Sequence, residues 1–160
     1  MHIRSFVQHD LAPLIDLTIE TFGPFYEDHF RPAVGDVVFA NQHGAWRDDY
    51  REQVAGLHDP AAHRYVAVAE EGPAIAGYVA WSADTARRNG AVSHLAVTAE
   101  YRRHGTGAAL CEHAFAAMRA LGAEVVEIGT GGDPFHAPAR ALYEKLGCTA
   151  VPVAYYYRQL

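Results

Sequence analysis

The sequence predicts an α/β fold in which helices flank a mixed sheet. Short apolar runs typical of strands alternate with segments whose apolar residues recur at helical spacing. A Glu71-Gly72-Pro73 turn joins two of these runs, which predicts an antiparallel hairpin. Residues 91–130 contain an apolar run, then a glycine-rich loop and a helix, and then a second apolar run. This strand–helix–strand order predicts that the two runs form a parallel pair of strands. The whole chain, 1–160, is expected to form a single domain.

The N-terminal part is predicted to contain one strand and two helices. Residues 3–7 have the pattern of a strand, and 10–22 follow as an amphipathic helix that Gly23-Pro24 is expected to end. Residues 23–43, rich in aromatic and acidic side chains, are expected to form a long irregular loop. A second helix is predicted over 44–58, with one face formed by Trp46, Tyr50, Val54 and Leu57.

The rest of the chain supplies most of the sheet. The hairpin pairs 64–69 with 74–81, and a turn near Asn89-Gly90 leads into the next strand. The remaining elements are a strand at 91–97, a helix at 108–121, a strand at 124–130, a helix at 138–146 and one strand or a pair at 151–158.

Composition excludes several classes of protein. The net charge of −6 and the lack of a basic face argue against nucleic-acid binding. No apolar stretch is long enough to cross a bilayer, and the N-terminus lacks the apolar centre of a signal peptide, so a cytoplasmic location without membrane contact is expected. Cys111 and Cys148 form neither a disulfide framework nor a metal motif, and the histidines lack ligand spacing, so no metal is expected.

A glycine-rich loop before a helix is the strongest functional signal. Arg102-Arg103-His104-Gly105-Thr106-Gly107 follows the apolar run 92–97 and opens the helical run 108–121. The first backbone N–H groups of a helix lack intrahelical acceptors, and the helix dipole adds positive charge there. Glycines let an anion approach the backbone, and the arginines supply charge beside it. The loop therefore predicts a phosphate-binding site.

The chain resembles the GNAT-type N-acetyltransferases in two motifs. The loop matches their Arg-x-x-Gly-x-Gly pattern, and 139–148, Ala-Arg-Ala-Leu-Tyr-Glu-Lys-Leu-Gly-Cys, resembles their Ala-x-x-Leu-Tyr-Glu-Lys-Leu-Gly-Phe helix. The resemblance implies a mostly antiparallel sheet with a splayed parallel strand pair, here 91–97 and 124–130. It also implies that acetyl-coenzyme A is the co-substrate and that a primary amine attacks it directly in a ternary complex.

The resemblance also implies roles for particular residues. The backbone of Leu95, Ala96 and Val97 would pair with the pantetheine arm. Tyr143 matches the tyrosine that commonly protonates the leaving thiolate, beside the cofactor. His136 stands where relatives often have an asparagine that contacts pantetheine. The pyrophosphate would be held by Arg102, Arg103, His104, Gly105, Thr106, Gly107 and Ala108.

The base that accepts the amine proton is predicted to be His94, which directly precedes the pantetheine-binding segment. The ordinary histidine pKa, about 6.5, leaves the ring mostly neutral at cellular pH. Strand side chains alternate between faces, and a bulge here would shift the count, so Ser93 competes with His94 for the position that faces the amine. Glu127, His136 and a water molecule are further candidates for the base.

The acceptor is expected to be a small cationic amine, either an aminoglycoside-like antibiotic or a polyamine. Residues 1–80 hold 12 acidic side chains against 5 arginines, a net charge of −7, whereas 81–160 carry +1. Carboxylates beside aromatic rings suit a cation. The predicted acceptor-binding residues are Phe25, Tyr26, Glu27, Asp28 and Trp46. A peptide or protein amine as acceptor and a non-catalytic acyl-coenzyme A sensor are the two competing hypotheses.

The C-terminal run suggests a mode of self-association. Val151 to Tyr157 is apolar, and it could add to the sheet edge of a second copy to give a homodimer. Its three tyrosines, 155 to 157, would alternate between two faces if the run is a strand.

Overall fold

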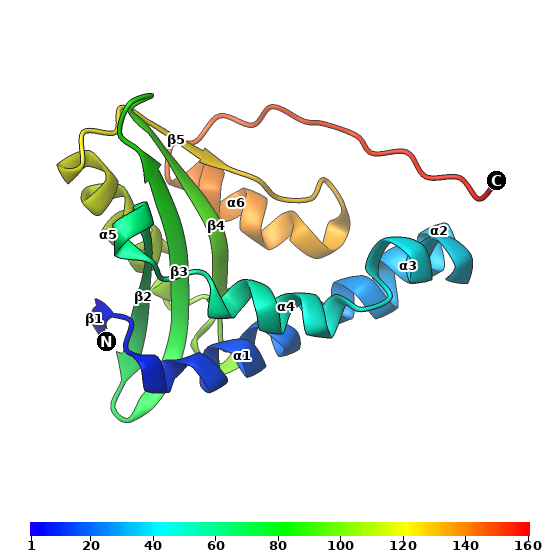
Figure 1. Ribbon diagram of the computed structural model, residues 1–160, viewed down its shortest axis with the longest axis horizontal. Helices are drawn as coiled ribbons and strands as arrows, with labels where there is room; N and C mark the ends of the chain where they lie inside the picture. Colours follow the sequence, from blue (N-terminus) through cyan, green and yellow to red (C-terminus); the bar gives the residue numbers. More distant parts are fainter.

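The computed structural model describes residues 1–160 and contains one five-stranded sheet in the order β1-β2-β3-β4-β5 (Figure 1). Neighbouring strands are antiparallel except for β4 and β5, which are parallel. The mixed, mostly antiparallel sheet with one parallel pair confirms the predicted fold class. The strands are β1 (His2–Ser5), β2 (Arg64–Glu71), β3 (Ala74–Asp84), β4 (Asn89–Val97) and β5 (Val125–Ile128).

Helices cover both faces of the sheet. On one face, α5 (Thr106–Ala120) buries Leu110, Ala114 and Met118, and residues of α6 (Ala137–Lys145) pack beside them. On the other face, α1 (Leu11–Pro24) and α4 (Trp46–Ala55) pack Leu14, Leu17 and Val54 against the sheet. The helical expectations for these four segments are confirmed.

The central strands send successive side chains to opposite faces. In β2, Val66 and Val68 face α1, whereas Ala67 and Ala69 face α5. All four are at most 3% exposed. Because both faces are covered, the buried middle of β2 is apolar at consecutive positions instead of alternating apolar with polar residues.

The expectation of an irregular loop at 23–43 was wrong. The helix continues through Gly23 and Pro24 into a π-helical segment (Phe25–Phe30), followed by α2 (Arg31–Val34) and α3 (Asp36–His43). A Cβ on Gly23 would lie 2.7 Å from Cη2 of Trp46, so the indole occupies the space that a side chain would fill. Here close packing of α4 on α1 outweighs the local helix-breaking signals.

The turn expected at Asn89-Gly90 lies earlier, at 85–88, and both residues belong to β4. Gly90 has a packing role, because a Cβ at this position would collide with Sδ of Met118.

The strand expected at 151–158 is absent. Residues 149–160 run as an extended segment away from the sheet (Figure 1) and make no backbone hydrogen bond. Apolar character alone does not form a strand, since a strand needs a partner. We call residues 149–160 the C-terminal segment.

None of the helices combines the length and the apolar character needed to cross a lipid bilayer.

Candidate active site

The two parallel strands separate halfway along β4. Their pairing runs from Asn89 opposite Val125 to Val92 opposite Ile128 and then stops. Residues 94–97 still pair with β3, yet their other backbone edge has no partner strand. Beyond this point lies a cavity of about 120 Å³, which we call the cleft; it is lined by Phe22, Val92, Ser93, His94, Leu95, Ile128, Gly129, Thr130, His136, Ala139 and Tyr143.

A β-bulge at Ser93 sets the direction of the side chains in the cleft. Trp81 of β3 opposes Val92 and Ala80 opposes His94, so Ser93 is the extra residue. Its Oγ donates to the carbonyl of Ala80 at 3.3 Å. Because of the bulge, His94 lies on the face of Ala80, toward α1 and α4, and its ring centroid is 6.4 Å from that of Tyr50.

His94 lies in an apolar setting. Nδ1 of the ring is buried and has no hydrogen-bond partner. Burial disfavours the charged ring and lowers the pKa of His94. The imidazole is therefore neutral at neutral pH, as a proton acceptor must be.

His136 lies in a different setting, beside a carboxylate. Its Nδ1 donates to Oδ1 of Asp133 at 2.6 Å, which leaves Nε2 free to act toward the cleft. The turn is held by Arg140, whose Nη1 donates to the carbonyls of Gly131 at 2.5 Å and Asp133 at 2.7 Å. The ring of His136 is thus fixed in tautomer and orientation.

Tyr143 supplies a hydroxyl to the wall of the cleft from α6. Burial raises its pKa to about 12, so the phenol keeps its proton throughout the physiological range. Cys111 lies beneath the sheet on α5, and burial raises the pKa of its thiol to about 12 as well. A thiol held neutral in this way is a packing group.

The loop after β4 leads directly into the N-terminus of α5. Gly105 has a φ of +86°, and the first helical hydrogen bond runs from the N–H of Ala109 to its carbonyl at 2.9 Å. The N–H groups of residues 106–108 precede that bond, as an anion site requires. Arg102 Nε donates to the carbonyl of Val97 at 2.8 Å, which ties the loop to the end of β4. The predicted phosphate loop and the cleft therefore adjoin.

Gly107 has a different task from Gly105. A Cβ added to Gly107 would lie 3.2 Å from Cδ2 of Leu142, so this glycine lets α5 approach α6 closely. The predicted residues Arg103 and His104 are exposed beside the helix start, and Arg103 has a φ of 65°, which non-glycine residues rarely adopt.

Glu127 lies outside the cleft. It pairs with Ala91 in the closed part of the parallel pair, and it is exposed. The structure therefore brings together Ser93, His94, His136 and Tyr143, and leaves Glu127 apart.

The predicted acceptor-binding residues have separate positions. Phe25 points into a second, larger cavity, and its ring centroid is 4.8 Å from that of His136. Trp46 is only 3% exposed and donates through Nε1 to Glu27 at 3.1 Å. Tyr26 stacks on Trp46 and its hydroxyl is 2.9 Å from that of Tyr50. Asp28 is exposed.

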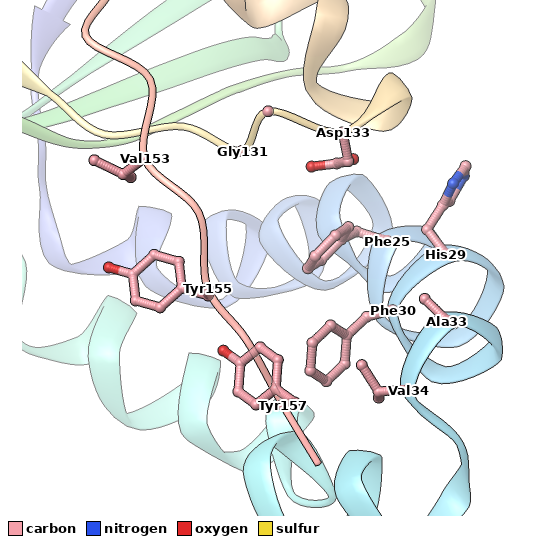
Figure 2. Close-up of a pocket in the computed structure, with 11 residues that line it drawn as sticks. Phe25, His29, Phe30, Ala33, Val34, Gly131, Asp133, Val153, Tyr155 and Tyr157 are labelled. Carbon is pink, nitrogen blue, oxygen red and sulfur yellow. The ribbon is translucent and has the colours of Figure 1, made fainter.

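The second cavity, of about 370 Å³, lies between the π-helical segment with α2 and the C-terminal segment (Figure 2). We call it the aromatic cavity. It is lined by Phe25, His29, Phe30, Ala33, Val34, Gly131, Gly132, Asp133, Val153, Tyr155 and Tyr157.

Three residues of the site were not predicted from the sequence. Asp133 and Arg140 orient His136, and Tyr50 flanks His94. A signal existed for the position of Asp133, because an acidic residue directly before a proline is typical of a helix start.

Comparison with known proteins agrees with this geometry. The family described as "Acetyltransferase (GNAT) family" matches residues 17–148. A solved structure from Desulfovibrio desulfuricans, described as a GNAT family acetyltransferase, has a TM-score of 0.71 at 21% identity, covering 94% of this chain and 86% of that chain. No curated protein sequence matches the chain.

Two further solved structures are similar. A GNAT family acetyltransferase from Brucella melitensis in complex with acetyl-CoA has a TM-score of 0.61 at 23% identity, covering 93% of this chain and 82% of that chain. An aminoglycoside acetyltransferase from an uncultured soil metagenomic sample has a TM-score of 0.63 at 21% identity, covering 99% and 98% respectively. At these identities the solved structures show a shared fold.

Proposed function

Because the chain belongs to the GNAT acetyltransferase family, we propose that it moves the acetyl group of acetyl-CoA to a primary amine by direct attack in a ternary complex. Acetyl-CoA is the co-substrate of this acyltransferase. The observation that carries the proposal is the cleft, where a free strand edge, a protonated phenol and two imidazoles meet beside an anion-binding loop.

The co-substrate would bind along the free edge of β4. Extended ligands add to an unpaired strand through backbone hydrogen bonds, so the pantetheine arm would lie along Leu95, Ala96 and Val97. The pyrophosphate would then reach the start of α5, with Arg103 and His104 beside it. The thioester would lie in the cleft.

The chemical step needs one proton acceptor and one proton donor. The amine lone pair attacks the thioester carbon, the C–N bond forms, and the C–S bond breaks as the tetrahedral intermediate collapses. Tyr143 donates its proton to the departing thiolate and is reprotonated from solvent. The burial that raises the pKa of Tyr143 also disfavours the charge of the departing thiolate. The thiolate is therefore a stronger base in the cleft than in water and can take the phenol proton.

We assign the acceptance of the amine proton to His94, whose imidazolium then releases that proton to solvent, so that both side chains return to their starting states. Its neutral ring lines the cleft, whose lining contains no carboxylate, and its Nδ1 has no hydrogen-bond partner. His136, held by Asp133 and in ring contact with Phe25, is assigned to the pantetheine.

The proposed acceptor is a small amine that carries positive charge in solution, a class supported by the net charge of −7 on residues 1–80, although the structure gives less support to the polycations, aminoglycosides and polyamines, expected from the sequence. Many of those carboxylates already have partners. Arg31 pairs with Glu27 at 3.2 Å and with Asp36 at 2.8 Å, and Arg51 pairs with Asp48 at 2.6 Å. The charge left for an acceptor is therefore smaller than the composition indicates.

The test is thiol release from acetyl-CoA in the presence of a panel of primary amines, with each product identified by mass spectrometry. Thiol release that depends on the amine and yields an N-acetyl product is expected. Saturable coenzyme A binding without turnover on any amine would overturn the proposal in favour of the acyl-coenzyme A sensor.

Two further expectations belong to this proposal. The free cysteines agree with a reducing, cytoplasmic location. The homodimer rests on the C-terminal segment, where Val151 is 83% and Tyr156 is 93% exposed. Sedimentation of the wild type and of Val151→Asp would test it, since a charge in a pairing strand should shift the population toward monomer.

A further inference from the structure

The aromatic cavity has two walls built from different parts of the chain. Phe25 and Phe30 project from the π-helical segment, with ring centroids 6.0 Å apart. Tyr155 and Tyr157 project from the C-terminal segment on the opposite side (Figure 2). Tyr157 meets Phe30 edge to face at 5.4 Å. The space between the walls is therefore bordered by ring faces and edges on both sides.

The extended backbone explains which tyrosines take part. Side chains alternate in an extended chain, so Val153, Tyr155 and Tyr157 share one side. All three line the cavity, whereas Tyr156 does not.

The charge in the cavity is small. No lysine or arginine is in the lining, and Asp133 is its only carboxylate. Its Oδ1 accepts from neutral or charged His136, so at most one negative charge faces the cavity. Such a lining repels neither an apolar body nor a single cation, and it cannot neutralise several ammonium groups.

The cavity adjoins the cleft through His136. His136 lines the cleft, and its ring centroid lies 4.8 Å from that of Phe25 and 5.0 Å from that of Phe135. Thr130 lines the cleft and the next residue, Gly131, lines the aromatic cavity, so one backbone segment borders both. His136 and the backbone at 130–131 therefore connect the wall of the cleft to the wall of the cavity.

We propose that the acceptor is a primary monoamine with an aromatic or similarly flat apolar group, which binds in the aromatic cavity while its amine reaches the cleft. The proposal rests on the proposed acetyl transfer. At about 370 Å³ the cavity has the size of a site for a small organic molecule. Rings at its walls would contact the acceptor by stacking or edge-to-face packing.

The first experiment compares acceptors that differ by the ring alone. Phenylethylamine is expected to exceed ethylamine in kcat/KM by about tenfold or more, because it buries an additional apolar surface. Spermidine and an aminoglycoside are expected to be poorer acceptors than phenylethylamine.

A matched pair of variants tests the location. Tyr155→Ala should raise the KM for phenylethylamine between about two- and tenfold, the range for one aromatic contact, and should leave the KM for ethylamine unchanged. Tyr156→Ala removes the adjacent ring, which is 93% exposed against 82% for Tyr155 and does not line the cavity, and should change neither value. Calorimetric binding of phenylethylamine to the protein loaded with coenzyme A gives a readout without turnover.

The outcomes separate the two proposals. Turnover that favours spermidine, an aminoglycoside or a peptide, or equal kcat/KM for phenylethylamine and ethylamine, would overturn the aromatic acceptor and keep the acetyl transfer. Binding of phenylethylamine that Tyr155→Ala weakens, without turnover on any amine, would overturn the transfer and keep the site. If Tyr155→Ala and Tyr156→Ala changed the KM for phenylethylamine equally, the acceptor would not bind in the aromatic cavity.

Discussion

Burial keeps the proton on Tyr143 and keeps it off His94, and these are the protonation states that the proposed acetyl transfer needs. A low-dielectric setting disfavours charge, so it keeps the proton on a phenol and keeps it off an imidazole. The pKa of Tyr143 rises to about 12 and that of His94 falls. In the proposed mechanism, the same physical effect thus prepares both the proton donor and the proton acceptor, without a charged partner for either.

Replacing Tyr143 tests the donor. Tyr143→Phe removes only the hydroxyl and should lower kcat about 100-fold, within the range for loss of a general acid. The dissociation constant of coenzyme A, measured by calorimetry, should stay within about twofold. Tyr65→Phe is the control, since Tyr65 stacks on Trp81 outside the cleft. A normal kcat in Tyr143→Phe would exclude the acid role.

The pH dependence tests the acceptor. Protonated His94 cannot take a proton, so kcat/KM should fall as pH decreases through its pKa. Because burial lowers that pKa, this acid limb should lie below the ordinary value of about 6.5. His94→Gln should lower the rate and remove the limb. A limb that persists in His94→Gln and disappears in His136→Gln would transfer the role to His136.

At the residue scale, the sequence indicated which segments carry the candidate residues, but it could not show how their side chains are arranged in space. The motifs put the phosphate loop and Tyr143 beside one cleft, because both follow from local pattern. The bulge at Ser93 could not be located, since it depends on pairing with Ala80 and Trp81 of another strand. For the same reason Trp46, predicted to contact an acceptor, is a core residue.

At the element scale, the helix start at α5 depends on a left-handed residue. Gly105 has a φ of +86°, and an added Cβ would meet nothing within 4 Å, so the cost of a substitution there is conformational. Gly122, at the other end of the same helix, has a φ of +88° and equally open space. The two glycines therefore form a matched pair, one beside the proposed phosphate site and one remote from it.

Gly105→Ala and Gly122→Ala should each lower the free energy of unfolding by about 1 kcal/mol, the cost of a left-handed alanine. Only Gly105→Ala should also raise the dissociation constant of coenzyme A, by about fivefold or more, because its methyl group obstructs the close approach of phosphate. Chemical denaturation and calorimetry measure the two quantities. Equal coenzyme A affinity in both variants would remove the loop from cofactor binding.

The misassigned elements share one cause. Residues 23–43 contain strong local stop signals, yet Trp46 and the stacked ring of Tyr26 hold the chain helical. The C-terminal run has a strong strand composition, yet no neighbouring strand pairs with it. Local propensity decides an element only where tertiary contacts do not oppose it.

For the whole molecule, an ionic cluster joins the first strand to the first helix and to β2. Arg4 donates to both carboxylate oxygens of Asp10, at 2.8 and 2.9 Å, and to Glu70 at 2.8 Å. Asp10 is 1% exposed and also accepts the N–H of Val7 at 2.9 Å. The hydrogen bonds from Arg4 lower the pKa of Asp10 below its ordinary value.

Asp10→Asn should therefore destabilise the whole fold, by about 2–3 kcal/mol at neutral pH, because it removes the buried one of the two carboxylates that pair with Arg4 and leaves only Glu70. The lowered pKa means that the folded state binds this proton less readily than the unfolded state. The stabilisation is thus complete above about pH 4 and is lost as pH falls through the lowered pKa. Asp16→Asn, on the exposed side of the same helix, should have little effect.

Denaturant unfolding of both variants and the wild type from neutral to acid pH measures this dependence. The difference between the wild type and Asp10→Asn should shrink as the solution is acidified. A difference that stays constant down to pH 2 would show that the carboxylate charge does not contribute.

The C-terminal segment affects how tightly and for how long a ligand can stay in the aromatic cavity. It forms one wall of the aromatic cavity, yet its backbone has no hydrogen bond to the rest of the molecule. A ligand that settles against this wall must also restrict the wall itself, and that ordering opposes binding through entropy. Favourable enthalpy from ring contacts would be largely cancelled, so occupancy would be modest and brief. Acetylation removes the ammonium charge, and the neutral product would then leave as the segment regains its freedom.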